Sequence, residues 1–169
     1  MTPRRPRTPH TGSRALAVLD IDGVVADARH RLHLLAGQPR HVDWVRFFHA
    51  AADDPLLAEG HDLAHRLAAD HEIVWLTGRP DYVRDLTVRW LAEHGLPDGA
   101  LLMHPEGDHR PARLVKLDHL RELERSRTIG IVIDDDPRVV ALLREEGLPV
   151  VPATWSPWSP AFPPQEQET

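Results

Sequence analysis

The sequence predicts an α/β fold, a Rossmann-like three-layer sandwich built on a five-stranded parallel sheet. Short apolar runs such as 16–19 and 73–76 are typical of buried strands, and they alternate with longer segments of helical periodicity. This alternation is typical of a parallel sheet that is covered by helices on both faces. The 169 residues have the length of one domain, and the chain contains no cysteine, which excludes disulfides and thiolate metal sites.

The first strand is expected over 14–19, after an N-terminal arm (1–13) that is rich in proline, arginine and threonine and has no periodicity. The single domain is expected to extend over 14–152. The connection between its first and second strands is too long for one crossover helix. We therefore expect residues from about 26 to 55 to form a small helical cap.

Two helices are predicted around the end of this cap. Asp43 has the side chain of an N-cap for a helix over 44–52, in which Trp44, Phe47 and Phe48 share one face. The Asp-Asp-Pro sequence at 53–55 is typical of a helix start, so the next helix is predicted from there to about residue 69.

The later elements alternate regularly. Strands are predicted over 72–76, 100–103, 128–133 and 148–151. Helices are predicted over 80–94, with Pro80 in the first position, over 112–124, and after an Asp136 N-cap to about residue 146. The segment 153–169 is rich in proline and tryptophan and is predicted to be a poorly ordered tail, although Trp155 could pack back on the domain.

Polar side chains follow four of the predicted strands. Asp20 and Asp22 follow the first strand, Thr77 the second, the loop 104–110 the third and the acidic run 134–136 the fourth. Because parallel strands end at the same edge of the sheet, we expect these groups to converge there. Two carboxylates held close together repel each other, and a hard cation or a shared proton offsets that repulsion.

The converging groups suit the binding and transfer of a phosphoryl group. Carboxylate oxygens are the ligands that Mg²⁺ prefers. Thr77 supplies a hydroxyl and Gly78 an accessible backbone N–H for phosphoryl oxygens. Lys116, the only lysine in the chain, and Arg79 or Arg110 supply positive charge. An aspartate carboxylate is a nucleophile toward phosphorus, and a second one donates a proton to the leaving oxygen.

The order of these motifs resembles that of the haloacid dehalogenase (HAD) superfamily. The motifs are D-x-D-G-V at 20–24, T-G-R at 77–79, the later Lys116 and D-D at 134–135, and the resemblance covers residues 16–151. It implies that Asp20 is the nucleophile and that Asp22 is the general acid and then the base. An acid at the second position of the first motif is typical of phosphohydrolases and phosphotransferases, not of dehalogenases.

The same resemblance implies the roles of the remaining motif residues. Thr77 corresponds to the hydroxyl that holds the phosphoryl group, and Lys116 to the lysine that neutralises nucleophile and phosphate. The Mg²⁺ site would consist of residues at the ends of the first and fourth strands, which bind the cation through carboxylate or carbonyl oxygens. These are Asp20, Asp22 through its backbone carbonyl, Asp134 and Asp135.

A narrower resemblance is to the 3′-phosphatase domain of phage-type polynucleotide kinase–phosphatases. It rests on five short segments that occur in the same order. These are Thr-Gly-Arg at 77–79, Leu-Leu-Met at 101–103, Gly-Asp-His-Arg at 107–110, Val-Lys at 115–116 and Ile-Asp-Asp at 133–135. The sequence departs from that family in having no kinase phosphate-binding loop and in carrying Asp136 where the family often has arginine.

By this likeness several residues would bind the substrate. Arg79 and Arg110 would contact its phosphate, with Gly78 beside them. An arginine soon after the first motif contacts phosphate in that family, and Arg29 and Arg31 compete for this role.

The sequence thus predicts a Mg²⁺-dependent phosphomonoesterase that acts through a phosphoaspartate, with the 3′-phosphate of a DNA or RNA end or of a nucleotide as substrate. One alternative is a small-molecule phosphatase of the 5′-nucleotidase or acid-phosphatase type. Alternatives of another class are a phosphoacceptor module of receiver type and a non-catalytic binding relative. The absence of an aspartate after the third strand disfavours the receiver type.

Composition limits the partners and the location. A net charge of −6 argues against broad electrostatic binding of nucleic acid, although it allows a local basic groove. No apolar stretch reaches membrane-spanning length and no export signal is recognisable, so we expect a cytoplasmic protein without a membrane partner.

Overall fold

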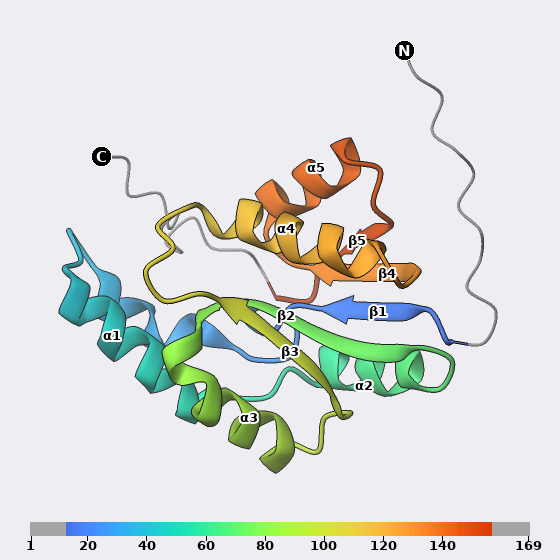
Figure 1. Ribbon diagram of the computed structural model, residues 1–169. Helices are drawn as coiled ribbons and strands as arrows, with labels where there is room; N and C mark the ends of the chain where they lie inside the picture. The colour runs from blue at the N-terminus through green and yellow to red at the C-terminus, as the bar shows by residue number, and fades with distance from the viewer. Residues whose placement is uncertain (1–12, 157–169) are drawn as a thin grey trace.

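The computed structural model describes residues 13–156, which form a five-stranded parallel sheet in the order β3-β2-β1-β4-β5 (Figure 1). The predicted fold class is therefore confirmed. The predicted arm before Ser13 and the predicted tail after Ser156 lie outside the described residues. The strands are β1 (Leu16–Leu19), β2 (Glu72–Pro80), β3 (Gly99–His104), β4 (Ile129–Asp134) and β5 (Val150–Pro152).

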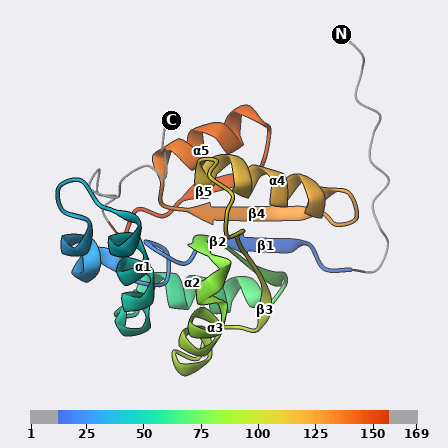
Figure 2. The same ribbon diagram turned by 60° about the vertical axis from the view of Figure 1, so that its left-hand side comes forward.

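Four helices cover the two faces of this sheet (Figures 1 and 2). Helices α2 (Ala58–Ala68) and α3 (Arg84–Glu93) lie on one face, and α4 (Ala112–Glu124) and α5 (Pro137–Glu145) on the other. Strand β1 alternates between two core clusters. Leu19 packs with Trp75 and Trp90, whereas Val18 packs with Leu120 on the opposite face. The central strand is thus buried from both sides.

The long connection after β1 is helical and lies beside the carboxyl ends of the strands (Figure 2). It contains a 3-10 helix, η1 (Ala28–Leu35), then α1 (His41–His49) and the short 3-10 helix η2 (Ala50–Asp53). Phe47 and Phe48 are buried in a third core cluster with Leu35, Val83 and Met103, and Trp44 packs against it. The shared aromatic face of α1 therefore joins the connection to the end of the sheet.

Two predicted helix starts in this connection are wrong. Helix α1 begins at His41, and Asp43 is its third residue, where its carboxylate accepts a hydrogen bond from the Arg40 backbone N–H at 2.9 Å. An acid at this position satisfies the N-cap N–H instead of serving as the cap itself. The helix predicted from 53–55 begins only at Ala58, because Asp54 turns inward to a buried ion-pair network.

The start of α3 also differs from the prediction. Pro80 is the last residue of β2, where it pairs with His104, and not the first residue of a helix. A short 3-10 helix, η3 (Asp81–Val83), separates it from α3. In contrast, the Asp136 N-cap is confirmed, since its carboxylate accepts the Arg138 backbone N–H at 2.8 Å. The bounds of α4 are those predicted.

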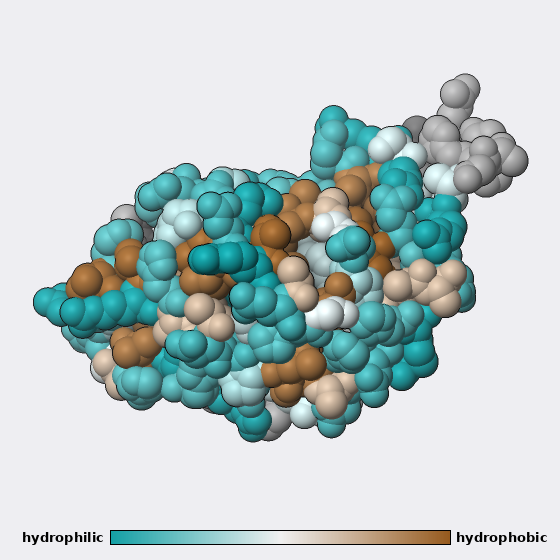
Figure 3. Space-filling model, turned by 90° about the horizontal axis from the view of Figure 1, so that it is seen from below, coloured by the Kyte–Doolittle hydropathy of each residue, from teal (hydrophilic) through white to brown (hydrophobic). Residues whose placement is uncertain are grey.

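The surface of the α2 and α3 face is mainly hydrophilic, with small hydrophobic patches that are separated from one another (Figure 3). Trp155 packs back on the domain, where its indole N–H donates to the Val24 carbonyl at 2.9 Å. No helix within residues 13–156 has the length and hydropathy needed to cross a lipid bilayer.

Candidate active site

Asp20 lies immediately after β1, at the carboxyl edge of the sheet. Its Oδ1 accepts the Ile21 backbone N–H at 2.7 Å, and its Oδ2 lies 2.9 Å from Lys116 Nζ. Lys116 comes from α4 and also donates to Asp134 Oδ2 at 2.6 Å. A single buried ammonium group therefore joins the carboxylates that end two neighbouring strands, β1 and β4.

Asp20, Asp134 and Asp135 form one acidic cluster. One carboxylate oxygen from each residue lies within 4.8 Å of those of the other two. Burial raises the pKa of Asp20 to about 7, although Lys116 opposes the shift. Burial, with repulsion from Asp134 and Asp20, raises the pKa of Asp135 to about 9. The same carboxylates raise the pKa of Lys116, against the effect of its burial.

The cluster fits a small divalent cation. Three hard oxygen donors converge, and burial together with repulsion between the carboxylates raises the pKa of Asp20 and Asp135. Gly23 leaves room beside them, because a Cβ at this position would lie 1.9 Å from Asp135 Oδ2. Its φ of +76° also favours glycine. Together these features match the ligand preferences of Mg²⁺.

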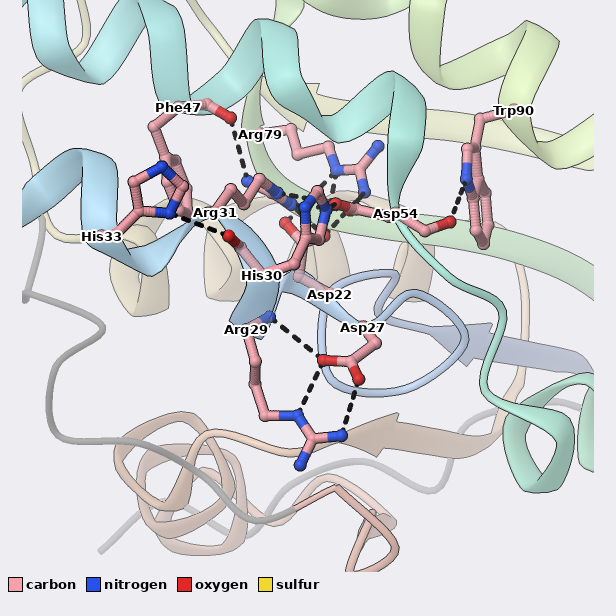
Figure 4. Close-up of polar contacts among 10 residues, drawn as sticks. All are labelled: Asp22, Asp27, Arg29, His30, Arg31, His33, Phe47, Asp54, Arg79 and Trp90. Carbon is pink, nitrogen blue, oxygen red and sulfur yellow. Dashed lines mark hydrogen bonds and ion pairs between the residues drawn. The ribbon is translucent and has the colours of Figure 1, made fainter.

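Asp22 lies one residue past this cluster and faces two arginines (Figure 4). Its Oδ1 accepts from Arg31 Nη2 at 2.8 Å and from Arg79 Nη2 at 2.7 Å. Burial alone would raise the pKa of Asp22, but the two guanidinium groups hold it well below its usual range. The two guanidinium groups thus favour the ionised form of the carboxylate that is expected to act as the acid.

Asp54 completes a network of two carboxylates and two guanidinium groups. Its Oδ1 accepts from Arg31 Nε and its Oδ2 from Arg31 Nη2, both at 2.8 Å, and Oδ2 also accepts from Arg79 Nη2 at 2.9 Å. Both arginine side chains and the Asp54 side chain have no exposed area. The His30 ring lies 2.8 Å from Asp54 Oδ1, and Trp90 donates to the Asp54 carbonyl at 2.9 Å (Figure 4).

Asp54 is the residue of this site that sequence reasoning missed. The pattern Asp-Asp-Pro pointed to a helix cap. No pattern in the sequence indicates that Asp54 is buried, because its burial depends on how the long connection between β1 and β2 folds back toward β2.

The structure separates the two arginines that competed for one role. Arg31 is buried and contacts Asp22, whereas Arg29 is half exposed and pairs with Asp27 at 2.6 Å (Figure 4). Arg110 lies on the loop before α4, where it pairs with Asp108 at 2.8 Å and Asp118 at 2.7 Å.

Thr77 lies within β2, beside β1, and not after the strand as predicted, because β2 continues to Pro80. It is buried, and its Oγ1 accepts the Arg79 backbone N–H at 3.2 Å. Gly78 follows it, and a Cβ there would lie 3.3 Å from the Ala112 side chain at the start of α4. The predicted motifs that follow β1, lie in the last part of β2 and end β4 therefore meet at one edge of the sheet.

Comparisons with known structures show that the fold is shared with other proteins. A structure described as the Pnkp1/Rnl/Hen1 RNA repair complex matches with a TM-score of 0.68 and 23% identity over 86% of this chain and 44% of that one. A second structure of the Pnkp1/Rnl/Hen1 complex has a TM-score of 0.69 and 22% identity over 90% and 50% of the two chains. The chain thus spans half or less of these relatives.

A class C acid phosphatase from Bacillus anthracis is also similar in fold, with a TM-score of 0.61 and 14% identity over 87% of this chain and 70% of that one. At these identities the likeness shows the fold. A search of curated protein sequences found no match.

A family model gives the more specific result. The model of the polynucleotide kinase PNKP phosphatase domain matches residues 14–154, which is most of the chain. The predicted HAD resemblance is thereby confirmed. The protein belongs to the family of the polynucleotide kinase PNKP phosphatase domain and is a phosphatase of the HAD superfamily.

Proposed function

We propose that the protein is a Mg²⁺-dependent phosphomonoesterase that removes the 3′-phosphate of nucleic-acid ends or nucleotides through a phosphoaspartate. The observation that carries this proposal is the buried cluster of Asp20, Lys116, Asp134 and Asp135, which places an aspartate nucleophile beside three further charges. Asp20, Asp134, Asp135 and the Asp22 carbonyl would hold the Mg²⁺. When bound, the cation would neutralise charge on the phosphoryl group.

In the first step an Asp20 carboxylate oxygen attacks phosphorus. The bond from phosphorus to the ester oxygen breaks, and that oxygen takes a proton from Asp22 and leaves as an alcohol. In the second step the Asp22 carboxylate accepts a proton from water as the water oxygen attacks phosphorus. The aspartyl–phosphate bond breaks, phosphate leaves and Asp20 is regenerated. Lys116 lies beside Asp20 and favours the ionised form of its carboxylate, the form that attacks phosphorus, against the effect of burial.

The depressed pKa of Asp22 has to rise before it donates a proton. A dianionic phosphate bound beside Asp22 repels its carboxylate and competes for the guanidinium groups of Arg31 and Arg79. Both effects raise the pKa of Asp22. Substrate binding would therefore produce the acid form where the leaving oxygen needs it.

The choice of a 3′-phosphate rests on the family and on the fold of its relatives. The matching family is a polynucleotide kinase phosphatase domain, and two similar structures belong to an RNA repair complex. The likeness to an acid phosphatase keeps free phosphomonoesters as the competing substrate class.

A substrate panel tests the proposal. Phosphate release would be measured with and without Mg²⁺ on 3′- and 5′-phosphorylated oligonucleotides, nucleoside monophosphates and sugar phosphates. We expect a preference for 3′-phosphates and none of this activity in Asp20→Asn. The matched control is Asp70→Asn, an exposed acid before β2, which should retain activity. Equal activity on all phosphomonoesters would contradict the substrate assignment, and activity in Asp20→Asn would contradict the mechanism.

A further inference from the structure

A pocket of about 210 Å³ lies beside the proposed active site, at the carboxyl ends of β2 and β3. Its walls come from α1, from the chain that follows β2 and from the loop before α4. Trp44, Phe48 and Tyr82 supply aromatic surfaces, and Pro80 and Arg110 also line it. Trp44 stacks on Phe48 with ring centroids 5.9 Å apart, and Phe48 meets Tyr82 edge to face at 6.5 Å.

One polar group in the wall of this pocket lacks a partner. His104 is 6% exposed, and its Nε2 donates to the Asp108 carbonyl at 2.7 Å. Its Nδ1 is buried without a hydrogen-bond partner among the described residues. Because Nε2 carries the proton in this bond, Nδ1 of the neutral ring is an acceptor. The His104 ring thus forms part of the pocket wall, whereas its Nδ1 is buried behind that wall.

The pocket and the proposed active site share strand β2. Arg79, which contacts Asp22, directly precedes the pocket residue Pro80. Strand β3 lies two positions from β1 in the sheet, which corresponds to about 10 Å at the usual strand spacing. One nucleotide spans such a distance when its base points away from the phosphate.

The size of the pocket limits what it holds. A volume of about 210 Å³ is below the ~300–1,000 Å³ of typical pockets for drug-sized ligands, so one planar ring system fits but a longer segment does not. Aromatic walls bind nucleobases by stacking, and this stacking accepts any base because every base has a π-face.

We propose that this pocket binds the base of the nucleotide whose phosphate is removed. The inference rests on the proposed function and deepens it, because it makes the terminal nucleotide, and not the phosphate alone, the recognised unit. The base stacks on the aromatic wall that includes Trp44 and Tyr82. Arg110 then contacts the nucleotide beside the base and not the phosphate that reacts.

The test compares two substrates that differ by one base. They are a short oligonucleotide with a 3′-phosphate and the same oligonucleotide whose 3′-terminal nucleotide is abasic. We expect kcat/KM to be about 5- to 100-fold higher with the base present, the range typical of one stacked base. Trp44→Leu should lose this preference while keeping its activity on the abasic substrate, and Trp44→Phe should retain it. Val42→Ala, an exposed change on the same helix, is the matched control.

Two results would overturn the inference while leaving the proposed function intact. One is equal kcat/KM of the wild type on both substrates. The other is a Trp44→Leu variant that is equally slowed on both. Direct binding decides the matter if no phosphatase activity is found at all. In EDTA, adenosine 3′-monophosphate should bind at least about 5-fold more tightly than the abasic ribose 3-phosphate in calorimetry, and equal affinities would exclude the base pocket.

Discussion

Arg79 Nη2 lies 2.9 Å from Asp54 Oδ2 and 2.7 Å from Asp22 Oδ1, so one guanidinium group joins a buried carboxylate to the proposed acid. Arg31, which lies in η1, also pairs with both Asp22 and Asp54. Two positive and two negative charges thus balance inside the protein. This balance explains how two fully buried arginines are tolerated and how the position of Asp22 is fixed.

Asp54→Asn should therefore impair both stability and turnover. Removing one partner of a buried ion-pair network typically costs about 3–5 kcal/mol, which urea unfolding would measure. In the molecules that remain folded, kcat should fall while the KM for the phosphate ester changes less, because Asp54 acts only through Arg31 and Arg79. Asp53→Asn, at the exposed neighbouring position, is the control. A variant with normal kcat would show that Asp54 is structural alone.

Asp22→Asn should make turnover depend on the leaving group. Loss of a general acid typically costs about 10²–10⁴-fold when the leaving oxygen needs a proton. We expect such a loss with a nucleoside 3′-phosphate and a much smaller one with p-nitrophenyl phosphate, whose leaving group departs without protonation. Steady-state rates on the two substrates measure the difference. Equal losses on both would argue against the acid role.

Substitution of Arg31 should lower kcat/KM much more than the same substitution of Arg29. Arg31→Lys replaces two hydrogen-bond arms of a buried guanidinium group with a single ammonium, so the contacts with Asp22 and Asp54 cannot all be kept. We expect kcat/KM to fall at least about 10-fold. Arg29→Lys removes only an exposed pair with Asp27 and should change kcat/KM less than about 2-fold. Similar effects of the two changes would contradict the structural distinction.

The fold and the convergence of the motifs could be predicted from the sequence, whereas the neighbours of Asp22 could not. Alternation of apolar runs with helical segments predicts a parallel sheet, and a parallel sheet brings Asp20, Thr77 and Asp134 to one edge. The sequence could not show which of Arg29 and Arg31 contacts Asp22, because this depends on the backbone conformation between them. The 3-10 helix η1 places Arg31 three residues after the buried Ala28, on the same face, and leaves Arg29 outside.

The acidic cluster should make the metal-free protein less stable as the pH rises. The pKa values of Asp20 and Asp135 are raised to about 7 and about 9, from an unfolded value near 3.9. The folded state therefore binds these protons more tightly than the unfolded state. Their contribution to stability is fully present below about pH 4 and is lost as the pH rises through 7 and then 9.

Asp135→Asn isolates this effect. The variant lacks one repelling carboxylate, so in EDTA it should gain stability relative to the wild type between pH 5 and pH 9. It should also lose most of the stabilisation that Mg²⁺ gives the wild type at pH 9. Urea unfolding at both pH values, with and without Mg²⁺, measures both quantities, and Asp70→Asn serves as control. A stability difference that is independent of pH would contradict the proposed origin of the raised pKa.

The central claim is that Asp20 becomes phosphorylated. Its most direct test is a rapid acid quench of the enzyme during turnover of a 3′-[³²P]phosphorylated oligonucleotide, followed by peptide mapping. The account predicts a label on the peptide that contains Asp20, formed before phosphate is released and absent from Asp20→Asn. Release of phosphate in a burst without any labelled protein, or a label on a peptide that lacks Asp20, would contradict it.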